Sequence, residues 1–204
     1  MKAQIDYSVY LVTDDNCLKG RTLLECVEAA LKGGVTLVQY RLKNGDGGVM
    51  YAEALKLKAL CDKYSVPLII NDRLDIAMAV GAAGVHLGQD DLPCSVARRI
   101  LGHDYVIGVS AHNPQEAVKA VEDGADYLGC GAVFGSATKN NVSELGLQSL
   151  EAIRRAVKVP MVGIGGVTSS NYALVRQTGA DGAAIISGIL SVDDIEAEVR
   201  KFKV

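Results

Sequence analysis

The chain has 204 residues, of which 49% are hydrophobic, and its formal net charge is −3. That length allows one large domain with a sizeable core, and Lys and Arg residues spread singly along the chain argue against a nucleic-acid partner. The five cysteines are odd in number and form no C-x-x-C pair, which argues against a disulfide framework or a zinc site and favours reduced thiols in a cytoplasmic protein.

Apolar runs and helix-forming segments alternate along the chain. The runs that predict strands are residues 9–12, 35–38, 67–70, 84–85, 106–110, 127–131, 160–164 and 182–186. The segments that predict helices run from Thr22 to the Gly33-Gly34 pair, from a Gly-rich loop at 44–48 to about Tyr64, over a short stretch after Asp72, and over 95–101, 114–123, 147–157, 171–177 and 192–202. No apolar run is long enough to span a membrane, so no membrane partner is expected.

Two of the helix starts carry a specific signal. Thr22 with Glu25 three residues later forms a capping-box pattern. Asn113-Pro114-x-Glu116 combines a cap residue, Pro at the first helical position and Glu at the third. These patterns predict helices that begin directly after Thr22 and Asn113.

The alternation predicts a single (β/α)8 barrel, or TIM barrel, in one domain over residues 1–204. The apolar runs are continuous, which is typical of parallel strands buried on both faces. Eight strand–helix units in roughly 200 residues fit a compact barrel of this kind. A doubly wound open sheet is the alternative, but it usually has fewer units, and the first turn here lacks a G-x-G-x-x-G pattern.

Two carboxylates are expected where the third and fourth strands end. Asp72 and Asp91 would lie at the same end of one sheet if these strands are parallel neighbours. Such a pair suits a hard divalent cation, and a cation suits a phosphorylated substrate. The alternative is that they cap helices, with Asp75 as the box partner of Asp72. After Asp91, Ser95 offers a separate cap for the next helix.

Polar side chains also follow the second strand, in the pattern Gln39-x-Arg41-x-Lys43. Alternate residues share one face while a strand persists, so the three side chains are expected to point the same way. A solvated edge is the common explanation of such a pattern. Because this one leaves a buried strand, an inward-facing anion site is favoured, in which Arg41 and Lys43 hold a pyrophosphate and Gln39 contacts a heterocycle.

Further candidates follow the later strands. Gly165-Gly166 and Ser187-Gly188 stand where many barrels bind phosphate through backbone N–H groups, although each pair is also typical of a turn. The segment 136–139 places hydroxyls around a lysine and suits a phosphate clamp or lid, or equally a solvated loop. His112 is either an acid–base group or a histidine packed beside the Asn113 cap.

Taken together, these residues resemble the thiamine-phosphate synthase family. The resemblance covers nearly the whole chain and keeps the order of the motifs, which are YLVTD at 10–14, QYRLK at 39–43, INDR at 70–73, GVHLGQDD at 84–91, GVSAH at 108–112, TK at 138–139, GIGG at 163–166 and GADG at 179–182. It implies a (β/α)8 transferase that uses Mg2+. The implied reaction joins a hydroxymethylpyrimidine diphosphate to a thiazole phosphate and gives thiamine phosphate and pyrophosphate.

The resemblance also implies a role for each matching residue. The implied metal ligands are Asp72 and Asp91. The implied catalytic residues are Arg41, Lys43, Ser110 and Lys139. The implied substrate-binding residues are Gln39 for the pyrimidine; Arg41, Lys43 and Lys139 for the diphosphate; Asn71 and Ser110 beside the metal; Ser136 and Thr138 near the thiazole or its phosphate; and Gly166, Ile186 and Ser187 for the thiazole phosphate.

Two other functions compete with this one. A thiazole tautomerase of the same fold would share the phosphate site and a histidine like His112, and a non-catalytic barrel could sense a phosphorylated ligand. The tautomerase would need neither the polar set of the second strand nor the pair formed by Asp72 and Asp91, and the sensor would have no use for that pair, so their presence favours the synthase. The expected partners are thus small phosphorylated molecules, and the sequence leaves open whether the chain forms a homo-oligomer.

Overall fold

Eight parallel strands close into a barrel in the order in which they occur along the chain. The computed structural model describes residues 4–135 and 146–202. The strands are β1 (Val9–Val12), β2 (Leu37–Tyr40), β3 (Leu68–Asn71), β4 (Gly84–Leu87), β5 (Val106–Ala111), β6 (Tyr127–Gly131), β7 (Met161–Ile164) and β8 (Gly182–Ile185). The barrel closes where β1 pairs with β8, with Val9 opposite Ala183. The predicted (β/α)8 barrel is confirmed, and the open sheet is wrong.

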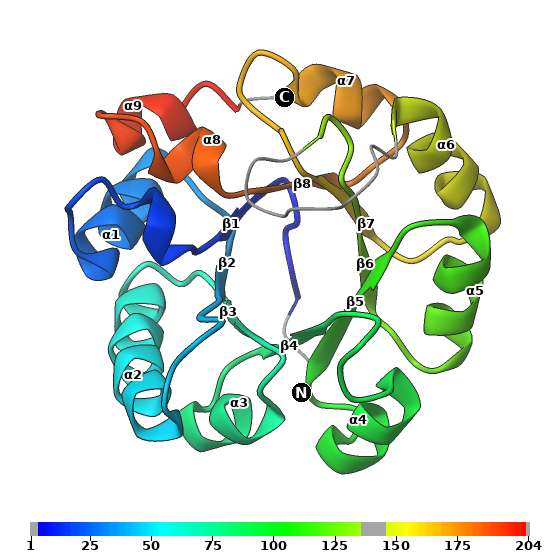
Figure 1. The fold of residues 1–204 in the computed structure, drawn as a ribbon, viewed down its shortest axis with the longest axis horizontal. Helices are drawn as coiled ribbons and strands as arrows, with labels where there is room; N and C mark the ends of the chain where they lie inside the picture. The colour runs from blue at the N-terminus through cyan, green and yellow to red at the C-terminus, as the bar shows by residue number, and fades with distance from the viewer. Residues whose placement is uncertain (1–3, 136–145, 203–204) are drawn as a thin grey trace.

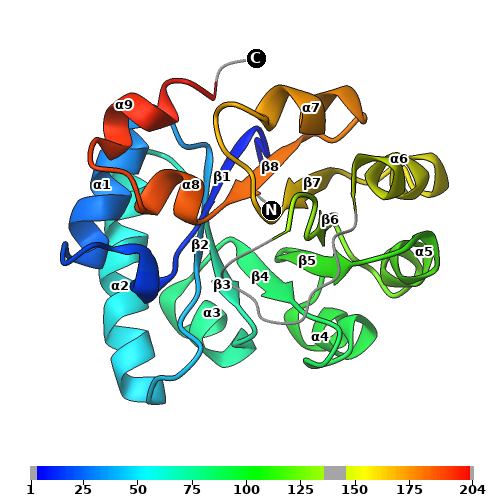
Figure 2. The same cartoon turned by 45° about the horizontal axis from the view of Figure 1, so that its top comes forward.

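Helices surround the barrel, as the view along its axis in Figure 1 and the tilted view in Figure 2 show. They are α1 (Leu23–Gly33), α2 (Gly47–Lys63), α3 (Leu74–Val80), α4 (Cys94–Leu101), α5 (Pro114–Glu122), α6 (Gly146–Ala156), α7 (Tyr172–Gln177), α8 (Ser187–Leu190) and α9 (Ile195–Val199), with a short 3-10 helix at Asp15–Cys17. Among the described residues, none of these helices has the length and apolar character that crossing a membrane requires.

Both predicted helix starts are confirmed. The Thr22 side chain accepts a hydrogen bond from the Glu25 N–H, and the Glu25 carboxylate accepts one from the Thr22 N–H, which completes a capping box at α1. At α5, the Asn113 side chain accepts from the Glu116 N–H at 2.8 Å. Each cap satisfies backbone N–H groups that the first helical turn leaves without a partner.

The second strand begins two residues later than predicted, at Leu37 rather than Val35. Gly34 has a left-handed conformation with φ 107°, and the N–H groups of Gly34 and Val35 both donate to the Ala30 carbonyl. Val35 therefore belongs to the end of α1, because its N–H helps to satisfy the last turn of that helix. As a result, Gln39 lies inside β2 instead of beyond it.

Two helix starts also differ from the prediction. The predicted loop at 44–48 is shorter, because α2 already begins at Gly47. The predicted helix at 192–202 is wrong in its extent. A separate short helix, α8, precedes it, and α9 begins only at Ile195, because the Asp194 side chain caps the new helix by accepting from the Ala197 N–H at 2.9 Å.

The core has two parts, one inside the barrel and one between the barrel and the helices. The interior cluster comprises Tyr7, Tyr10, Val12, Leu37, Ile69, Val106, Tyr127, Val162 and Ala184. The outer cluster is larger and includes all five cysteines, which are buried and free. Three tyrosines lie inside the barrel, where Tyr7 packs on Tyr127 with ring centroids 4.8 Å apart.

Candidate functional site

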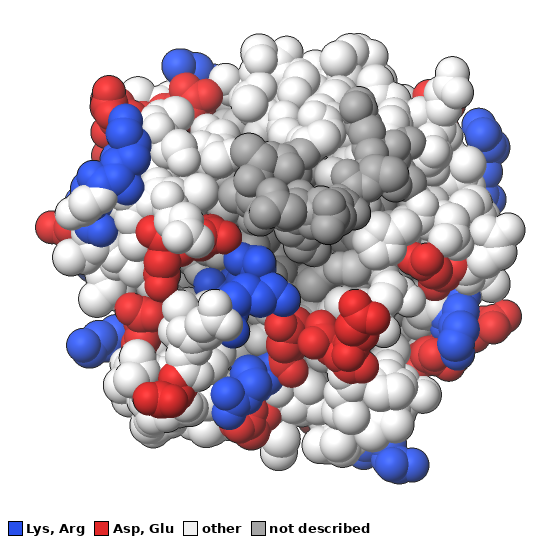
Figure 3. Space-filling view, in the orientation of Figure 1, with Lys and Arg blue, Asp and Glu red and all other residues white. Residues whose placement is uncertain are grey.

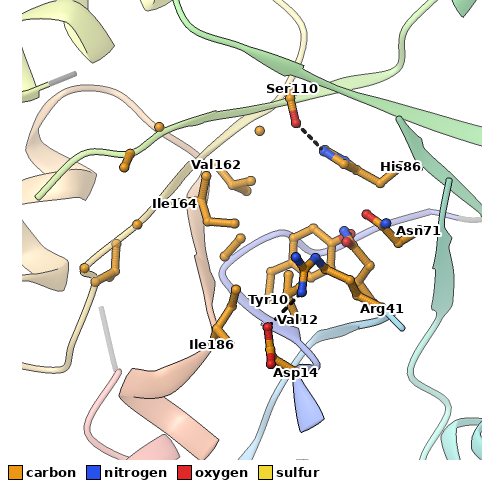
Figure 4. A pocket seen from close by; sticks show the side chains of 18 of the residues that line it. Tyr10, Val12, Asp14, Arg41, Asn71, His86, Ser110, Val162, Ile164 and Ile186 are labelled. Atoms are coloured by element: carbon orange, nitrogen blue, oxygen red, sulfur yellow. Dashed lines mark hydrogen bonds and ion pairs between the residues drawn. The ribbon is translucent and has the colours of Figure 1, made fainter. Parts of the chain in front are cut away.

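A cavity opens among the carboxyl ends of the strands, which is where TIM-barrel sites lie. Nine of the residues that the sequence nominated line it, namely Gln39, Arg41, Asn71, Ser110, His112, Gly165, Gly166, Ile186 and Ser187. Figure 4 shows apolar side chains of β7 and the residue after β8 on one side and polar ones from β2 to β5 on the other. The structure therefore brings together residues that are up to 148 positions apart, from Gln39 to Ser187.

The polar set of the second strand divides into two environments. Gln39 is buried inside the barrel, with only 4% of its surface exposed, and Arg41 lines the same cavity. Lys43 lies further out, with 53% of its side chain exposed, and its Nζ is 3.6 Å from the Asp72 carboxylate. The inward direction is thus confirmed for Gln39 and Arg41, whereas Lys43 lies beside the carboxylates outside the cavity lining.

Arg41 is held by a buried ion pair with Asp14. The guanidinium Nη1 donates to Asp14 Oδ2 at 2.8 Å, and the exposed fractions of the two side chains are 14% and 8%. The backbone and side chain of Asn16 donate to the other oxygen of Asp14 at 3.0 and 2.9 Å. A buried carboxylate with this many donors keeps the guanidinium in one place, so a cation faces the cavity in a fixed orientation.

Asp72 and Asp91 lie next to each other, as their positions after β3 and β4 predict. The pKa of the Asp72 carboxyl is raised from 3.8 to about 6, first by burial and then by the hydrogen bond and charge of Asp91, while Lys43 acts in the opposite direction. Basic and acidic side chains gather on this face near the place where Figure 1 draws β3 and β4 (Figure 3). Two carboxylates this close repel each other unless a proton or a cation lies between them.

The chemistry of this donor set fits a hard divalent cation. Mg2+ prefers oxygen ligands and is often bound by one or two carboxylates together with the phosphates of a substrate. Within residues 4–135 and 146–202, no cluster of three or more His, Cys, Asp or Glu side chains forms a complete metal cage. The pair of Asp72 and Asp91 therefore suits an ion that a phosphorylated ligand helps to bind.

The alternative role as helix caps is wrong for both carboxylates. Asp72 has a left-handed backbone with φ 60°, and the residue that precedes α3 is Arg73. The cap position of α4 is Pro93, and Ser95 lies inside that helix rather than capping it. Asp91 instead accepts a hydrogen bond from the Gly88 N–H at 2.6 Å, which closes the turn after β4.

The predicted phosphate side lies at the ends of β7 and β8. Gly166 has φ 65°, and a Cβ there would come within 2.5 Å of the Gly135 carbonyl oxygen, so glycine is needed for the loops to pack. Ser187 begins α8, directly after Ile186. The remaining nominated residues, Ser136, Thr138 and Lys139, lie outside the described residues, together with the proposed lid.

His112 lines the cavity but is engaged elsewhere. Its Nδ1 is 2.9 Å from the Glu116 carboxylate and its backbone N–H donates to the same oxygen at 2.8 Å. The side chain is 42% exposed, so the packed alternative is only partly right. The contact with Glu116 ties His112 to the first turn of α5.

A hydrogen-bonded group inside the barrel, made of Tyr10, Tyr127 and His86, had no predicted role. Tyr10 lies next to Gln39, and His86 next to Ser110, which are both nominated residues. The missing signal is the inward register of a parallel barrel, in which alternate residues of each strand face the interior. His86, two residues after Gly84, and Tyr127 are polar groups at such positions in otherwise apolar strands.

Comparison with known proteins identifies similar chains over nearly the full length. The family model described as thiamine monophosphate synthase matches residues 9–189. A thiamine-phosphate synthase of Ruminiclostridium cellulolyticum is 47% identical over 201 residues, covering 98% of this chain and 96% of that protein. One of Clostridium acetobutylicum is 50% identical over 196 residues, covering 96% and 93%.

A solved structure agrees with these matches. The thiamine phosphate pyrophosphorylase of Pyrococcus furiosus superposes with a TM-score of 0.89 at 36% sequence identity, covering 97% of this chain and 94% of that one. Other barrels, such as a 3-hexulose-6-phosphate synthase with a TM-score of 0.66 at 17% identity, share the fold alone.

Proposed function

This chain belongs to the thiamine monophosphate synthase family, and we propose that the cavity at the carboxyl ends of its strands is where it joins a hydroxymethylpyrimidine diphosphate to a thiazole phosphate. The chain is a transferase, a thiamine-phosphate synthase. One observation carries the assignment of the site. Gln39 and Arg41 line the cavity, and two adjacent carboxylates, Asp72 and Asp91, lie at the same end of the barrel.

In this reaction a C–N bond forms as a C–O bond breaks. The thiazole nitrogen supplies the electron pair of the new bond, and pyrophosphate leaves with the electron pair of the old one. The pyrimidine ring stabilises positive charge at the reacting carbon, so the protein has to neutralise the leaving group and hold the two substrates in line. Arg41 and Lys43 are the described cations that would bind the diphosphate, and Asn71 and Ser110 would lie beside the metal.

Asp72 and Asp91 would hold Mg2+. When bound, this ion supplies positive charge that stabilises the leaving diphosphate. Lys43, 3.6 Å from Asp72, would bring a second positive charge to the same place. By the same resemblance, Lys139 would contact the diphosphate, while Ser136 and Thr138 would line the thiazole region.

The thiazole phosphate would bind at the other side of the cavity. Backbone N–H groups at Gly166, Ile186 and Ser187 would receive the phosphate, which is a common arrangement after the last two strands of such barrels. The apolar side chains of Val162 and Ile164 would exclude water from the ring. No protein nucleophile and no general base are required by this displacement, so His112 has no assigned step.

The wider setting follows from the same proposal. The partners would be the two small phosphorylated substrates, with neither nucleic acid nor a membrane involved, and a homo-oligomer is left open. All five thiols are buried and free, which supports a reducing, cytoplasmic location. Residues 1–204 would form one domain, since the strands from Val9–Val12 to Gly182–Ile185 make one closed barrel.

The direct test is to mix the chain with both substrates and Mg2+ and to detect thiamine phosphate and pyrophosphate by mass spectrometry. Both products are expected in equal amounts, and Arg41→Gln should abolish most of the turnover. Arg99→Gln, at an exposed position of α4, is the matched control and should behave as the wild type. Isomerisation of a thiazole without coupling would instead favour the tautomerase, and binding without any turnover would favour the sensor.

A further inference from the structure

A chain of hydrogen bonds crosses the interior of the barrel and joins two residues of the cavity wall. Gln39 Nε2 donates to the Tyr10 hydroxyl at 2.6 Å, and the Tyr10 and Tyr127 hydroxyls are 2.8 Å apart. The Tyr127 hydroxyl is 3.0 Å from His86 Nδ1, and His86 Nε2 is 3.1 Å from Ser110 Oγ. Five side chains from β1, β2, β4, β5 and β6 are thus linked in one row.

The strands leave room for this row at two glycines. A Cβ at Gly108 would lie 2.1 Å from the Tyr127 ring, and one at Gly129 would lie 2.9 Å from His86 Cε1. No side chain could occupy either position without displacing the ring. The interior is therefore shaped around Tyr127 and His86, and Tyr127 has no exposed surface at all.

The contact with Gln39 sets the direction in which the row can donate, because both phenols are protonated. Burial raises the pKa of Tyr10 and Tyr127 well above the ordinary value of a phenol, so both hydroxyls keep their protons. Because Tyr10 accepts from Gln39, it has its own proton to give to Tyr127, and Tyr127 then has its proton to give to Nδ1 of His86. In this arrangement a neutral imidazole carries its proton on Nε2 and donates it to Ser110.

This direction decides what the ends of the row offer to the cavity. With Nε2 engaged by Tyr10, the atom of the Gln39 amide that remains is Oε1, a hydrogen-bond acceptor. Among the described residues, no donor is bonded to Oε1, yet Oε1 is not among the fully buried atoms that lack a partner. It is therefore accessible, and it opens on the cavity that Gln39 lines. At the other end, Ser110 accepts from His86 and keeps its own proton for a ligand.

From this arrangement we infer that Tyr127, which lies outside the cavity lining, is a positioning residue that sets the substrate specificity of the site. Through Tyr10 it holds the Gln39 amide so that an acceptor faces the ring, and the site selects a heterocycle whose edge carries N–H donors. This inference rests on the proposed function, in which the ring is an aminopyrimidine. An amide that is free to flip could offer either a donor or an acceptor, and the selection would be lost.

The test compares the aminopyrimidine diphosphate with its 4-oxo counterpart, in which an acceptor replaces the donor. For each, kcat/KM is measured with saturating thiazole phosphate and Mg2+, and Kd is measured by calorimetry without the thiazole. The wild type should prefer the amino compound strongly. Tyr127→Phe keeps the ring and removes the hydroxyl, and it should reduce the preference by about tenfold, the effect of roughly one hydrogen bond.

Two further variants make the outcome decisive. Tyr10→Phe breaks the same row beside Gln39 and should reduce the preference equally, so the inference stays testable if Tyr127→Phe fails to fold. Tyr172→Phe removes another buried hydroxyl, which donates to the Ser8 carbonyl at 2.8 Å outside the row, and should leave the preference unchanged.

The inference is overturned if the wild type has no preference for the amino compound, or if a folded Tyr127→Phe or Tyr10→Phe variant keeps the full preference. It is also overturned if Tyr172→Phe reduces the preference as much as these two variants do. The proposed function fails separately, when the wild type forms no thiamine phosphate. In that case the ratio of the two Kd values still decides the role of Tyr127.

Discussion

The guanidinium of Arg41 is oriented before any ligand binds. Asp14 accepts a hydrogen bond from the guanidinium at 2.8 Å, and the Thr13 hydroxyl accepts one from the backbone N–H of Arg41 at 2.9 Å. Ordering a long side chain costs roughly 1.5–2 kcal/mol of conformational entropy, and this cost is met on folding rather than on binding. Lys43, half exposed and 3.6 Å from Asp72, lacks such a frame, so we expect its contribution to binding to be more sensitive to salt.

Asp91→Asn separates a metal ligand from a residue that only closes a turn. Asn can still accept the hydrogen bond from the Gly88 N–H through Oδ1, so the free energy of unfolding should change by less than about 1 kcal/mol. Asn is a much poorer ligand for Mg2+ than a carboxylate. We therefore expect a sharply raised Mg2+ requirement and a loss of turnover of about a hundredfold or more, measured by titrating Mg2+ in the coupling assay.

The neighbouring Asp90→Asn is the control, because Asp90 is exposed in the same turn and should titrate like the wild type. If the Mg2+ titration of Asp91→Asn overlaid that of the wild type, the pair formed with Asp72 could not be the metal site. The role of Asp91 would then be limited to its bond with Gly88.

At the residue scale, the sequence predicted the groups that we propose to bind the substrates but missed the groups that hold them in place. Gln39, Arg41 and Asp72 are recognisable because polar residues at the ends of apolar runs are unusual. Tyr127 and Tyr10 lie inside such runs, where an aromatic side chain is ordinarily core. Their partnership across 117 positions depends on the closure of the barrel, which no local pattern encodes.

Helix α5 shows what a local pattern does encode. The pattern Asn113-Pro114-x-Glu116 predicted its start, and the structure adds a role for the carboxylate. Burial alone would raise the pKa of the Glu116 carboxyl. The opposite effect is larger, and it comes from hydrogen bonds donated by the backbone and side chain of His112, from the charge of that side chain and from a bond donated by Asn113. The pKa is therefore lowered below 4.5. The lowered pKa means that the folded state favours the charged form of Glu116.

This shift predicts a pH-dependent effect of Glu116→Gln on stability. A carboxyl with a lowered folded-state pKa contributes stability above its unfolded-state pKa, and that contribution is lost as the pH falls through the folded-state pKa. The wild type should therefore be more stable than the variant above about pH 5. The difference should disappear as the pH falls well below 4.5, as measured by urea unfolding at a series of pH values.

Glu122→Gln is the control on the same helix. Among the described residues, no group donates a hydrogen bond to the Glu122 carboxylate, and the side-chain bonds of α5 involve Glu116 and Lys119 instead. Replacing Glu122 should change the free energy of unfolding only slightly, and the change should not depend on pH in this way. A Glu116→Gln difference that stayed constant down to pH 3 would show that the charge of Glu116 does not stabilise the fold.

The elements themselves were predictable where local chemistry dominates. Apolar runs located every strand, and the caps at Thr22 and Asn113 located two helices. The errors fell where a residue serves the neighbouring element, as Val35 does when it completes the end of α1. They also fell where a side chain starts a new helix within a polar stretch, as Asp194 does before α9.

At the scale of the whole molecule, the barrel and its helices shield every cysteine. Burial raises the pKa of Cys61 and Cys130 to about 12 and that of Cys94 to about 11, and it also raises the pKa of Cys17 and Cys26. A thiol reacts with Ellman's reagent through its thiolate, so the native chain should react very slowly at pH 8. All five thiols should react in denaturant, and rapid reaction of even one native thiol would contradict the packing described.

The closure of the barrel depends on the last unit of the chain returning to the first. Arg21, before α1, donates through its guanidinium to the carbonyls of Leu190, Val192 and Asp193, which connect α8 with α9. Lys19 reaches the same segment through an ion pair with the Asp193 carboxylate. The two cations differ in their surroundings, because the Arg21 contacts are mostly part-buried, whereas 95% of the Asp193 side chain is exposed.

Replacing each cation in turn tests which contact keeps the barrel closed. Arg21→Ala leaves carbonyl groups of the connecting segment without donors, so the free energy of unfolding should fall by about 2–3 kcal/mol. Arg21→Lys should recover less than half of this loss, because an ammonium cannot match the planar fork of a guanidinium. Lys19→Ala should cost less than about 1 kcal/mol, as is usual for an exposed ion pair. Urea unfolding measures all three, and faster amide exchange in α9 should accompany Arg21→Ala alone. Equal losses for Arg21→Ala and Lys19→Ala would mean that charge attraction to this segment, rather than the bonds to its carbonyls, holds the ends of the barrel together.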